Sequence, residues 1–495
     1  MTLLHEAVRA TAKRHPGRVA VSGVDGSLSY AELDRRADAL AASFVAAGVV
    51  PGDRVLIWAA KSCAVVVAMQ AALRAGAAYV PVDSTSPAGR VATVVRDCAP
   101  RVVCASPDRA EEIARFLEEM PVFCDLGDLP EAAAPVAVAG GEDDLAFILY
   151  TSGSTGTPKG VCLSHANAMA FVRWAIAELA LGKEDRLANH APFSFDLSVL
   201  DLYGALCTGG SVHLVAAELA YAPEQLVDFL RWREITVWYS VPSALLLMMR
   251  DGGLLDRPAP AALRAVLFAG EPFPIGALRD LAGWTGARLL NLYGPTETNV
   301  CTAHEVGEDD LARDRPVPIG TAVSGDTVWA VVDGEVARPG EAGELHVSGP
   351  SVMRGYWGRE PQRDPYPTGD LVSVREDGSF EYLGRRDAMV KVRGHRVELG
   401  DVEAALTAHP DIAEAAAVVR GSALGGRIEA FVVPRPGARL GVLAVKRHCA
   451  ERLPTYMIAD DAHFVPALPR TANGKVDRAA LAVRHPSNPK EGSTV

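Results

Sequence analysis

Residues 150–160 read YTSGSTGTPKG, and the fold of the chain can be inferred outward from this stretch. Apart from Tyr150 and Pro158, every residue in it is Gly, Ser, Thr or Lys. A loop of this composition offers backbone N–H groups, hydroxyl donors and one ammonium group to an anionic ligand. Its three glycines allow the backbone to approach that ligand closely, because no Cβ stands in the way. The stretch therefore predicts a phosphate-binding loop.

The residues on either side of this loop strengthen that interpretation. Residues 145–150, LAFILY, form a short apolar run typical of a buried strand, and residues 167–179 have the pattern of a helix. A strand, a glycine-rich loop and a helix in this order present backbone donors to phosphate. The loop is not a Walker A motif, because Lys159 stands between Pro158 and Gly160. A flexible Ser/Thr/Gly linker is the alternative, and the preceding strand argues against it.

Composition excludes several classes of protein. The chain has 495 residues, 49% of them hydrophobic and 22% charged, which indicates a globular protein of two or more domains. A net charge of −12 argues against a general nucleic-acid or membrane-binding surface. We expect no membrane span, because Gly, Pro or charge interrupts each apolar stretch. The eight cysteines show no metal-binding spacing, and Cys63, Cys98 and Cys449 are expected to be inert core thiols in a reducing cytoplasm.

The N-terminal part of the chain alternates helical and strand patterns. Helices are expected over residues 30–44 and 64–75, and strands over residues 55–58 and 79–83. This rhythm predicts a parallel sheet with helices on its faces. The expected fold class is α/β: a large N-terminal domain of layered α/β sheets with a β-rich subregion, and a small, mobile α+β C-terminal domain.

Two later apolar strands end in polar residues. Residues 264–269 run into Gly270-Glu271-Pro272, and residues 289–292 run into Tyr293-Gly294-Pro295-Thr296-Glu297. Ligands of open α/β sheets bind at such carboxyl ends of strands. For Glu297, a hydrogen-bonded glutamate at a buried strand end is the alternative.

The composition and the polarity pattern of the sequence change near residue 316. Gly, Pro, Val and alternating polarity predict a mostly antiparallel β-region over about residues 316–386. A domain boundary is expected near Asp387, giving domains 1–386 and 387–495. In the second domain we expect strands over 415–419 and 428–433, separated by helical segments.

Five stretches together resemble the adenylate-forming superfamily of amino-acid adenylation domains, acyl-CoA synthetases and luciferase-like ligases. They are TSGSTGTPKG (151–160), NLYGPTET (291–298), PTGD (367–370), GRRDAMVKVRGHRVE (384–398) and LPRTANGKVDR (468–478). Each stretch alone is weak evidence for the family, but the five occur in the family's order along nearly the whole chain. Residues 189–206 and 269–274 most resemble free-standing prolyl-adenylating enzymes, which load proline onto a carrier protein.

The resemblance implies an ATP site and its Mg²⁺. The loop residues Thr151, Ser152, Gly153, Ser154, Thr155 and Lys159 would contact the β- and γ-phosphates. The adenine would lie against Tyr293 and Gly270-Glu271-Pro272, with Asn291 near its amino group and Gly294 and Thr296 adjoining. Asp370 would accept hydrogen bonds from both ribose hydroxyls, Arg385 would donate to the same sugar, and Glu297 would bind Mg²⁺.

The resemblance to the family also implies a catalytic lysine and a hinge. Lys475 matches the family lysine that bridges the substrate carboxylate and the phosphate during adenylation; an ordinary surface lysine is the alternative. The C-terminal domain would then rotate about Asp387, bringing the side that carries Lys391 and Gly394 to the active site for thiol transfer. A turn residue with no hinge role is the alternative for Asp387.

The substrate is expected to be a neutral amino acid. Asp196 matches the aspartate that pairs with the α-amino group in amino-acid-activating members; a helix-capping aspartate is the alternative. The expected side-chain pocket is apolar, offers no second charge, and consists of Leu197, Leu200, Tyr239, Leu267, Ala269, Leu292, Val300 and Cys301. Proline as the substrate follows from the resemblance alone. Another small or medium neutral amino acid remains an alternative substrate, because one methylene changes the binding free energy by only ~1–3 kcal/mol.

The acceptor is expected to be a separate phosphopantetheinylated carrier protein, since no Asp-Ser attachment motif follows Lys475. Two rival functions stay open. An acid:CoA ligase uses the same scaffold, and Asp196 argues against it, because an unpaired buried carboxylate is costly. A non-enzymatic nucleotide sensor would not need Lys159, Glu297 and Lys475, all of which are present.

Overall fold

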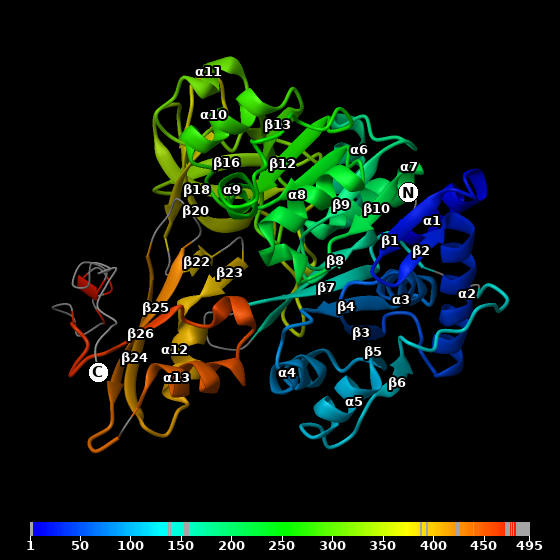
Figure 1. The fold of residues 1–495 in the computed structure, drawn as a ribbon, viewed down its shortest axis with the longest axis horizontal. Coiled ribbons are helices and arrows are strands. Elements are labelled where there is room, and N and C mark those ends of the chain that lie inside the picture. Colours follow the sequence, from blue (N-terminus) through cyan, green and yellow to red (C-terminus); the bar gives the residue numbers. More distant parts are fainter. Residues whose placement is uncertain are drawn as a thin grey trace. The chain divides into compact units, whose positions relative to one another are not determined.

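The computed structural model divides into two compact units (Figure 1), one of Met1–Thr151 with Pro158–Asp387 and one of Ser152–Thr157 with Ala388–Val495. Within them the structure describes residues 3–136, 138, 140–152, 158–386, 389–392, 395–420, 426–438, 440–470, 476, 478 and 480–481. The fold class is mixed α/β, as predicted.

The first unit contains a seven-stranded sheet with the order β19-β8-β7-β4-β3-β5-β6. Its strands are β3 (Arg54–Trp58), β4 (Ala78–Val82), β5 (Val102–Ala105), β6 (Val122–Asp125), β7 (Leu145–Thr151), β8 (Lys159–Ser164) and β19 (Gly355–Tyr356). Strands β3 to β7 are parallel, with helices α3 (Cys63–Arg74), α4 (Ala88–Cys98) and α5 (Pro107–Ala114) between them along the chain. The predicted βαβ arrangement is confirmed.

The glycine-rich loop leads into a strand, so the predicted passage from loop to helix was wrong. Strand β8 pairs antiparallel with β7, and Thr151 lies opposite Lys159. The reason lies in residues 161–163, Val-Cys-Leu, which are buried in the sheet and are therefore better suited to a strand than to a loop. Helix α6 (His165–Glu178) begins only after them, where Ser164 and Asn167 form a capping box.

A nine-stranded sheet forms the second layer of this unit, in the order β15-β14-β13-β12-β11-β9-β10-β1-β2. Its strands are β1 (Val19–Gly23), β2 (Gly26–Ser29), β9 (Arg186–Asn189), β10 (Ser211–Leu214), β11 (Val237–Ser240), β12 (Ala265–Ala269), β13 (Arg288–Tyr293), β14 (Thr302–Glu305) and β15 (Thr321–Ala322). The central strands from β13 to β1 are parallel, so their carboxyl ends share one edge. The associated helices are α1 (Leu4–Arg14), α2 (Tyr30–Ala46), α7 (Ala205–Thr208), α8 (Pro223–Trp232), α9 (Pro242–Arg250), α10 (Ile275–Trp284) and α11 (Glu308–Leu311).

The predicted antiparallel region is confirmed as a five-stranded sheet, β17-β16-β18-β20-β21. Its strands are β16 (Thr327–Val332), β17 (Glu335–Val336), β18 (Ala342–Ser348), β20 (Tyr366–Val374) and β21 (Phe380–Arg385). All neighbouring pairs run antiparallel, and one face of the alternating strand β18 is buried. Such alternation is what the sequence pattern had indicated.

The second unit has a hairpin, β22 (Met389–Val392) and β23 (His395–Glu398), and a three-stranded sheet, β24 (Ile412–Arg420), β25 (Arg427–Pro434) and β26 (Asp461–Phe464). Helices α12 (Leu399–Thr407) and α13 (Val442–Ala450) flank the pair of β24 and β25. The prediction that helical segments separate these two strands was wrong, because they pair directly, with Arg420 opposite Arg427. The few residues between them leave no length for a helix and its two connections.

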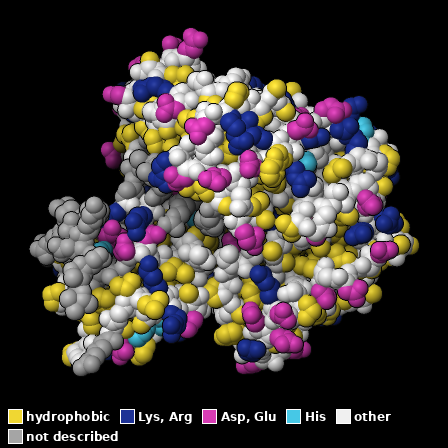
Figure 2. Space-filling view, viewed as in Figure 1, with side chains coloured by type: hydrophobic (Ala, Val, Ile, Leu, Met, Phe, Trp, Pro, Cys, Tyr) yellow, Lys and Arg dark blue, Asp and Glu magenta, His cyan; other side chains and the backbone are white. Residues whose placement is uncertain are grey.

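The surface charges, the cysteines and the helix lengths can be compared with what the composition indicated. Lys and Arg side chains alternate with Asp and Glu over the visible face of the first unit (Figure 2). All eight cysteines are free thiols, and burial raises the pKa of Cys63 and Cys98 to about 12 and that of Cys449 to about 11. Within the described residues, no helix combines the length and the apolar character needed to cross a bilayer.

A partly buried ion pair joins the residues that immediately precede β9, β11 and β12 of the nine-stranded sheet. Asp185 accepts hydrogen bonds from Nε and Nη2 of Arg264 (2.7 and 2.8 Å), from the Gly182 N–H (2.8 Å) and from Thr236 Oγ1 (2.8 Å). Burial alone would raise the pKa of Asp185, but the hydrogen bonds from Arg264, Gly182 and Thr236 outweigh burial and hold this pKa below its usual value.

We expect Asp185→Asn to lower the unfolding free energy of the first unit by about 2 kcal/mol at pH 7, because one charge-assisted bidentate contact is lost. The difference from wild type should be complete above the ordinary aspartate pKa and should shrink as the pH falls through the lowered pKa of the folded state. Urea unfolding followed by tryptophan fluorescence measures it, since all seven tryptophans lie in the first unit. The exposed Asp143, which pairs with Arg354, is the control: Asp143→Asn should cost less than about 0.5 kcal/mol. Equal effects of the two changes would contradict the assignment.

Candidate active site

The carboxyl ends of β11, β12 and β13 bring together most of the expected amino-acid pocket. Tyr239 lies opposite Leu267, and Ala269 lies opposite Leu292 in the parallel register. Residues two apart on a strand point to the same face, so these side chains line one face of the sheet. Leu197, Leu200 and Val300 belong to the same buried cluster, whereas Cys301 packs in the adjoining cluster with Tyr293.

Asp196 lies in the connection between β9 and a π-helical turn, Leu200–Gly204. It is 8% exposed, and its carbonyl group accepts a hydrogen bond from the Val199 N–H (3.1 Å). Burial raises the pKa of Tyr239 well above its usual value, and the negative charges of Asp196 and Asp201 raise it further.

A second buried acidic residue, Asp201, which the sequence analysis did not name, follows Asp196 in the chain, and the expectation of a pocket without a second charge stays a prediction. Asp201 is 1% exposed, and burial raises its pKa well above the usual value, although a hydrogen bond from Asn189 and the charge of Lys61 oppose this effect. The sequence analysis missed Asp201 because it lies five residues after Asp196 within an otherwise apolar run. The available signal was that a carboxylate in such a run needs a partner.

Three residues expected at the nucleotide are hydrogen-bonded to one another. Asp370 accepts hydrogen bonds from Nη1 of Arg385 (2.8 Å) and from the Tyr293 hydroxyl group. Asp370 and Arg385 are direct partners in the pairing of β20 with β21, and Tyr293 ends β13. A carboxylate with two acceptor oxygens, fixed in this way within the antiparallel strand β20, is suited to a pair of hydroxyl groups such as those of a ribose.

The turn that follows Tyr293 requires glycine. A Cβ at Gly294 would lie 1.6 Å from the carbonyl oxygen of Asn299. Nearby, the Asn291 amide donates to the carbonyl of Pro318 (2.8 Å), and Glu271 accepts from the Ser243 N–H at the start of α9 (3.1 Å). Gly270, between Glu271 and the end of β12, has a φ angle of 91°. These contacts fix the polar ends of β12 and β13 side by side.

Glu297 lies close to Lys159 through a residue that the sequence analysis missed. Glu297 is 0% exposed, and its Oε1 accepts a hydrogen bond from the Tyr356 hydroxyl group (2.7 Å). The Lys159 ammonium group lies 5.7 Å from the centre of the Tyr356 ring. Tyr356 thus joins the expected metal ligand to the lysine that closes the glycine-rich loop.

A buried carboxylate such as that of Glu297 is suited to Mg²⁺, which prefers oxygen ligands. Among the described residues, no group of three His, Cys, Asp or Glu side chains is arranged to hold a metal ion. An ion at Glu297 would therefore draw its other ligands from phosphate and water, as Mg²⁺ commonly does.

Six expected site residues lie outside the described part of the chain: Gly153, Ser154, Thr155, Asp387, Gly394 and Lys475. The backbone of Lys391 is described and pairs with Arg396 in the β22–β23 hairpin, whereas its side chain is not. The roles expected for all of these residues stay predictions.

The apolar cluster at the parallel sheet edge, the buried Asp196 and the hydrogen-bonded group of Asp370, Arg385 and Tyr293 agree with the adenylate-forming class that the sequence analysis expected. The AMP-binding enzyme model matches residues 8–357, and the AMP-binding enzyme C-terminal domain model matches residues 401–475. The chain belongs to the AMP-binding enzyme family.

Two curated relatives match nearly the full length. The chain is 50% identical to the L-proline--[L-prolyl-carrier protein] ligase of Pseudomonas fluorescens, over 97% of this chain and 99% of that protein. It is 42% identical to the protein of the same name from Streptomyces coelicolor, over 97% and 96% of the two chains. Among solved structures, the amide bond synthetase McbA from Marinactinospora thermotolerans superposes with a TM-score of 0.87 at 26% identity, over 96% of this chain and 99% of that one.

Proposed function

We propose that this enzyme is an L-proline--[carrier protein] ligase. In the first step a proline carboxylate oxygen attacks the α-phosphorus of ATP, and pyrophosphate leaves. In the second step the phosphopantetheine thiol of a separate carrier protein attacks the acyl carbon of prolyl-AMP, and AMP leaves. The observation that carries the proposal is 50% identity to a ligase of this name along nearly the whole of both chains.

The site chemistry supports an amino-acid substrate. Asp196 is a buried acidic residue next to an apolar cluster, and its carboxylate is suited to accept hydrogen bonds from the protonated amino group of an amino acid. The side chains of this cluster are apolar, which suits the small ring of proline. Tyr239 and Asp201 add polarity on one side of the same cluster, and neither excludes the secondary ammonium group of proline.

The nucleotide residues are assigned roles by the same reasoning. Asp370 and Arg385 hold the ribose, Tyr293 and Gly270-Glu271-Pro272 flank the adenine, and the glycine-rich loop with Lys159 holds the outer phosphates. Glu297 would hold Mg²⁺, which supplies positive charge that stabilises the negative charge developing on the phosphates. Lys475 bridges the two reacting groups in the adenylating arrangement, and rotation about Asp387 exchanges it for the Lys391 side during transfer.

The reaction is proposed to take place in the cytoplasm, where ATP and Mg²⁺ are available. The eight free thiols fit a reducing compartment.

An ATP–pyrophosphate exchange assay with a panel of amino acids tests the specificity. Proline should give the greatest exchange, ahead of pipecolate, alanine and valine, because the cost of a misfitted methylene is ~1–3 kcal/mol. In the second half-reaction, a phosphopantetheinylated carrier should accept the prolyl group where free CoA does not. Greater exchange with another neutral amino acid would overturn the proline assignment, and efficient transfer to CoA would favour the acid:CoA ligase.

A further inference from the structure

One ammonium group joins the two large sheets of the first unit at their carboxyl ends. Lys61 follows β3 of the seven-stranded sheet, and its Nζ donates to three consecutive carbonyl groups that follow or end β9 of the nine-stranded sheet. The acceptors are the carbonyl oxygens of Asn189 (2.9 Å), His190 (2.9 Å) and Ala191 (3.2 Å). An ammonium group has three N–H donors, so these contacts use all of them.

Lys61 is also linked to Asp201 through Asn189, whose carbonyl group accepts a hydrogen bond from Lys61 and whose side-chain amide donates to Asp201. Burial lowers the pKa of Lys61 to about 7, while the negative charges of Asp201 and Asp83 act in the opposite direction. Asp201 accepts a hydrogen bond from the Asn189 amide at Oδ2 (3.3 Å), whereas its Oδ1 has no hydrogen-bond partner among the described residues. Lys61 is thus a source of compensating positive charge for a carboxylate that burial penalises.

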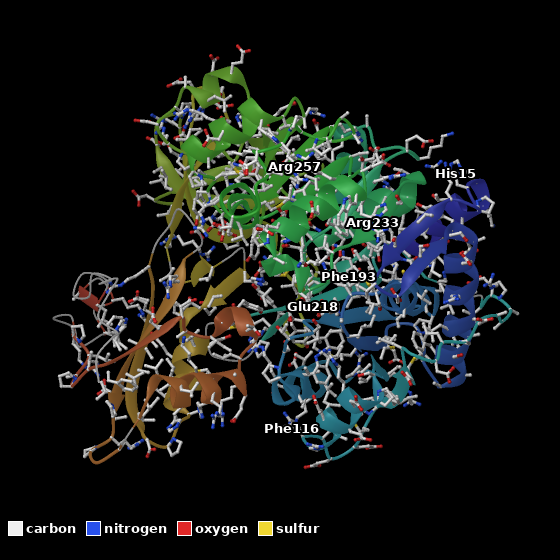
Figure 3. All side chains as sticks on the ribbon, in the orientation of Figure 1. His15, Phe116, Phe193, Glu218, Arg233 and Arg257 are labelled. Atoms are coloured by element: carbon white, nitrogen blue, oxygen red, sulfur yellow. The ribbon has the colours of Figure 1, made fainter. Side chains whose placement is uncertain are left out.

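The hydrogen bond from Lys61 to Ala191 and the hydrogen bond from Asn189 to Asp201 hold the two ends of residues 191–201, which we call the aspartate segment. Its start is held through the Ala191 carbonyl, and its end carries Asp201 in the π-helical turn. Asp196 lies midway between them, and Phe193, labelled in Figure 3, is buried within the same segment. A single-turn π-helix of this kind is rare and is often found at functional sites.

Lys61 is costly to keep at this position. An ammonium group that loses its hydration destabilises the folded chain, and an apolar side chain of similar length would avoid that cost. The stability of the sheets therefore gives little reason for a lysine, because β3 and β9 already lie in extensively buried sheets. A requirement for exact placement of the aspartate segment does give a reason.

We propose that Lys61 is a positioning residue for the amino-acid site, which holds the start of the aspartate segment directly and its end through Asn189, and so sets the place of Asp196 opposite the substrate's ammonium group. This inference rests on the proposed function, in which Asp196 pairs with that group. Lys61 itself need not touch the substrate, and its effect should appear in amino-acid binding and not in ATP binding.

The test compares Lys61→Met with Lys13→Met, which removes an exposed lysine from the last turn of α1. Steady-state exchange kinetics should show the KM for proline raised by about tenfold or more in Lys61→Met, with the KM for ATP close to wild type. The thermal midpoint should fall, because three carbonyl groups lose a donor. Lys61→Arg, which keeps the charge and several N–H donors, should recover most of the affinity for proline. The Lys13→Met control should match wild type in all three measurements.

Other outcomes separate this inference from the function on which it rests. If both KM values rise together, Lys61 has only a structural role and the inference is overturned. An unchanged KM for proline overturns it as well. If Lys61→Met does not fold, Lys61→Gln, which keeps two N–H donors without the charge, takes its place with the same criteria. Failure of the wild-type enzyme to exchange with any amino acid would refute the proposed function instead.

Discussion

Lys475→Ala should abolish prolyl-AMP formation while leaving transfer from preformed prolyl-AMP to the carrier largely intact. Removing one group that stabilises transition-state charge typically costs about 10²–10³-fold in rate. The loss should be confined to adenylation, because in the proposed mechanism Lys475 bridges the carboxylate and the phosphate only in that step. The C-terminal family match, residues 401–475, includes this lysine.

Two assays on the same preparation measure this difference. ATP–pyrophosphate exchange reports the first step, and single-turnover loading of the carrier from synthetic prolyl-AMP reports the second. Lys13→Ala serves as the control, since Lys13 is exposed on α1. An equal loss in both steps would mean that Lys475 acts elsewhere, or that the chain no longer folds correctly.

Asp196→Asn should reduce kcat/KM for proline by about 10–100-fold, because a hydrogen bond to a charged group contributes about 1.5–3 kcal/mol. Asparagine keeps the shape of the side chain, so the buried segment should keep its fold. The KM for ATP should stay near its wild-type value, since Asp370, Arg385 and Tyr293 form a separate hydrogen-bonded group.

Steady-state exchange with varied proline and varied ATP measures this change, and the exposed Asp143→Asn is the matched control. If Asp196→Asn exchanges proline as well as wild type, the substrate ammonium group pairs with another residue. Asp201 is the candidate for that role, because it is buried beside the same tyrosine.

Local patterns were sufficient for much of the fold. The βαβ rhythm before residue 140 predicted parallel strands, and the alternating polarity after residue 316 predicted the antiparallel sheet. Local patterns gave wrong predictions where the structure of a short apolar run depended on which strand it pairs with. Residues 161–163 form a strand and not a loop, and β24 pairs directly with β25, because pairing with a neighbouring strand is decided by the tertiary structure.

Site residues that lie in sequence motifs could be predicted. Contacts between residues far apart in the sequence could not. Asp370, Arg385 and Tyr293 were named from separate motifs, and the structure joins them by hydrogen bonds. Lys61 is 128 residues from Asn189, and Tyr356 is 59 residues from Glu297, so no local pattern could connect them.

The most direct test of the central claim is the complete reaction. Purified enzyme is mixed with ATP, Mg²⁺, proline and a phosphopantetheinylated carrier protein, and the products are analysed by intact-protein mass spectrometry and nucleotide chromatography. The account requires one prolyl thioester on the carrier for each AMP and each pyrophosphate formed, and none when any one substrate is left out. If no neutral amino acid led to pyrophosphate release or to an aminoacyl-AMP, the account would be contradicted.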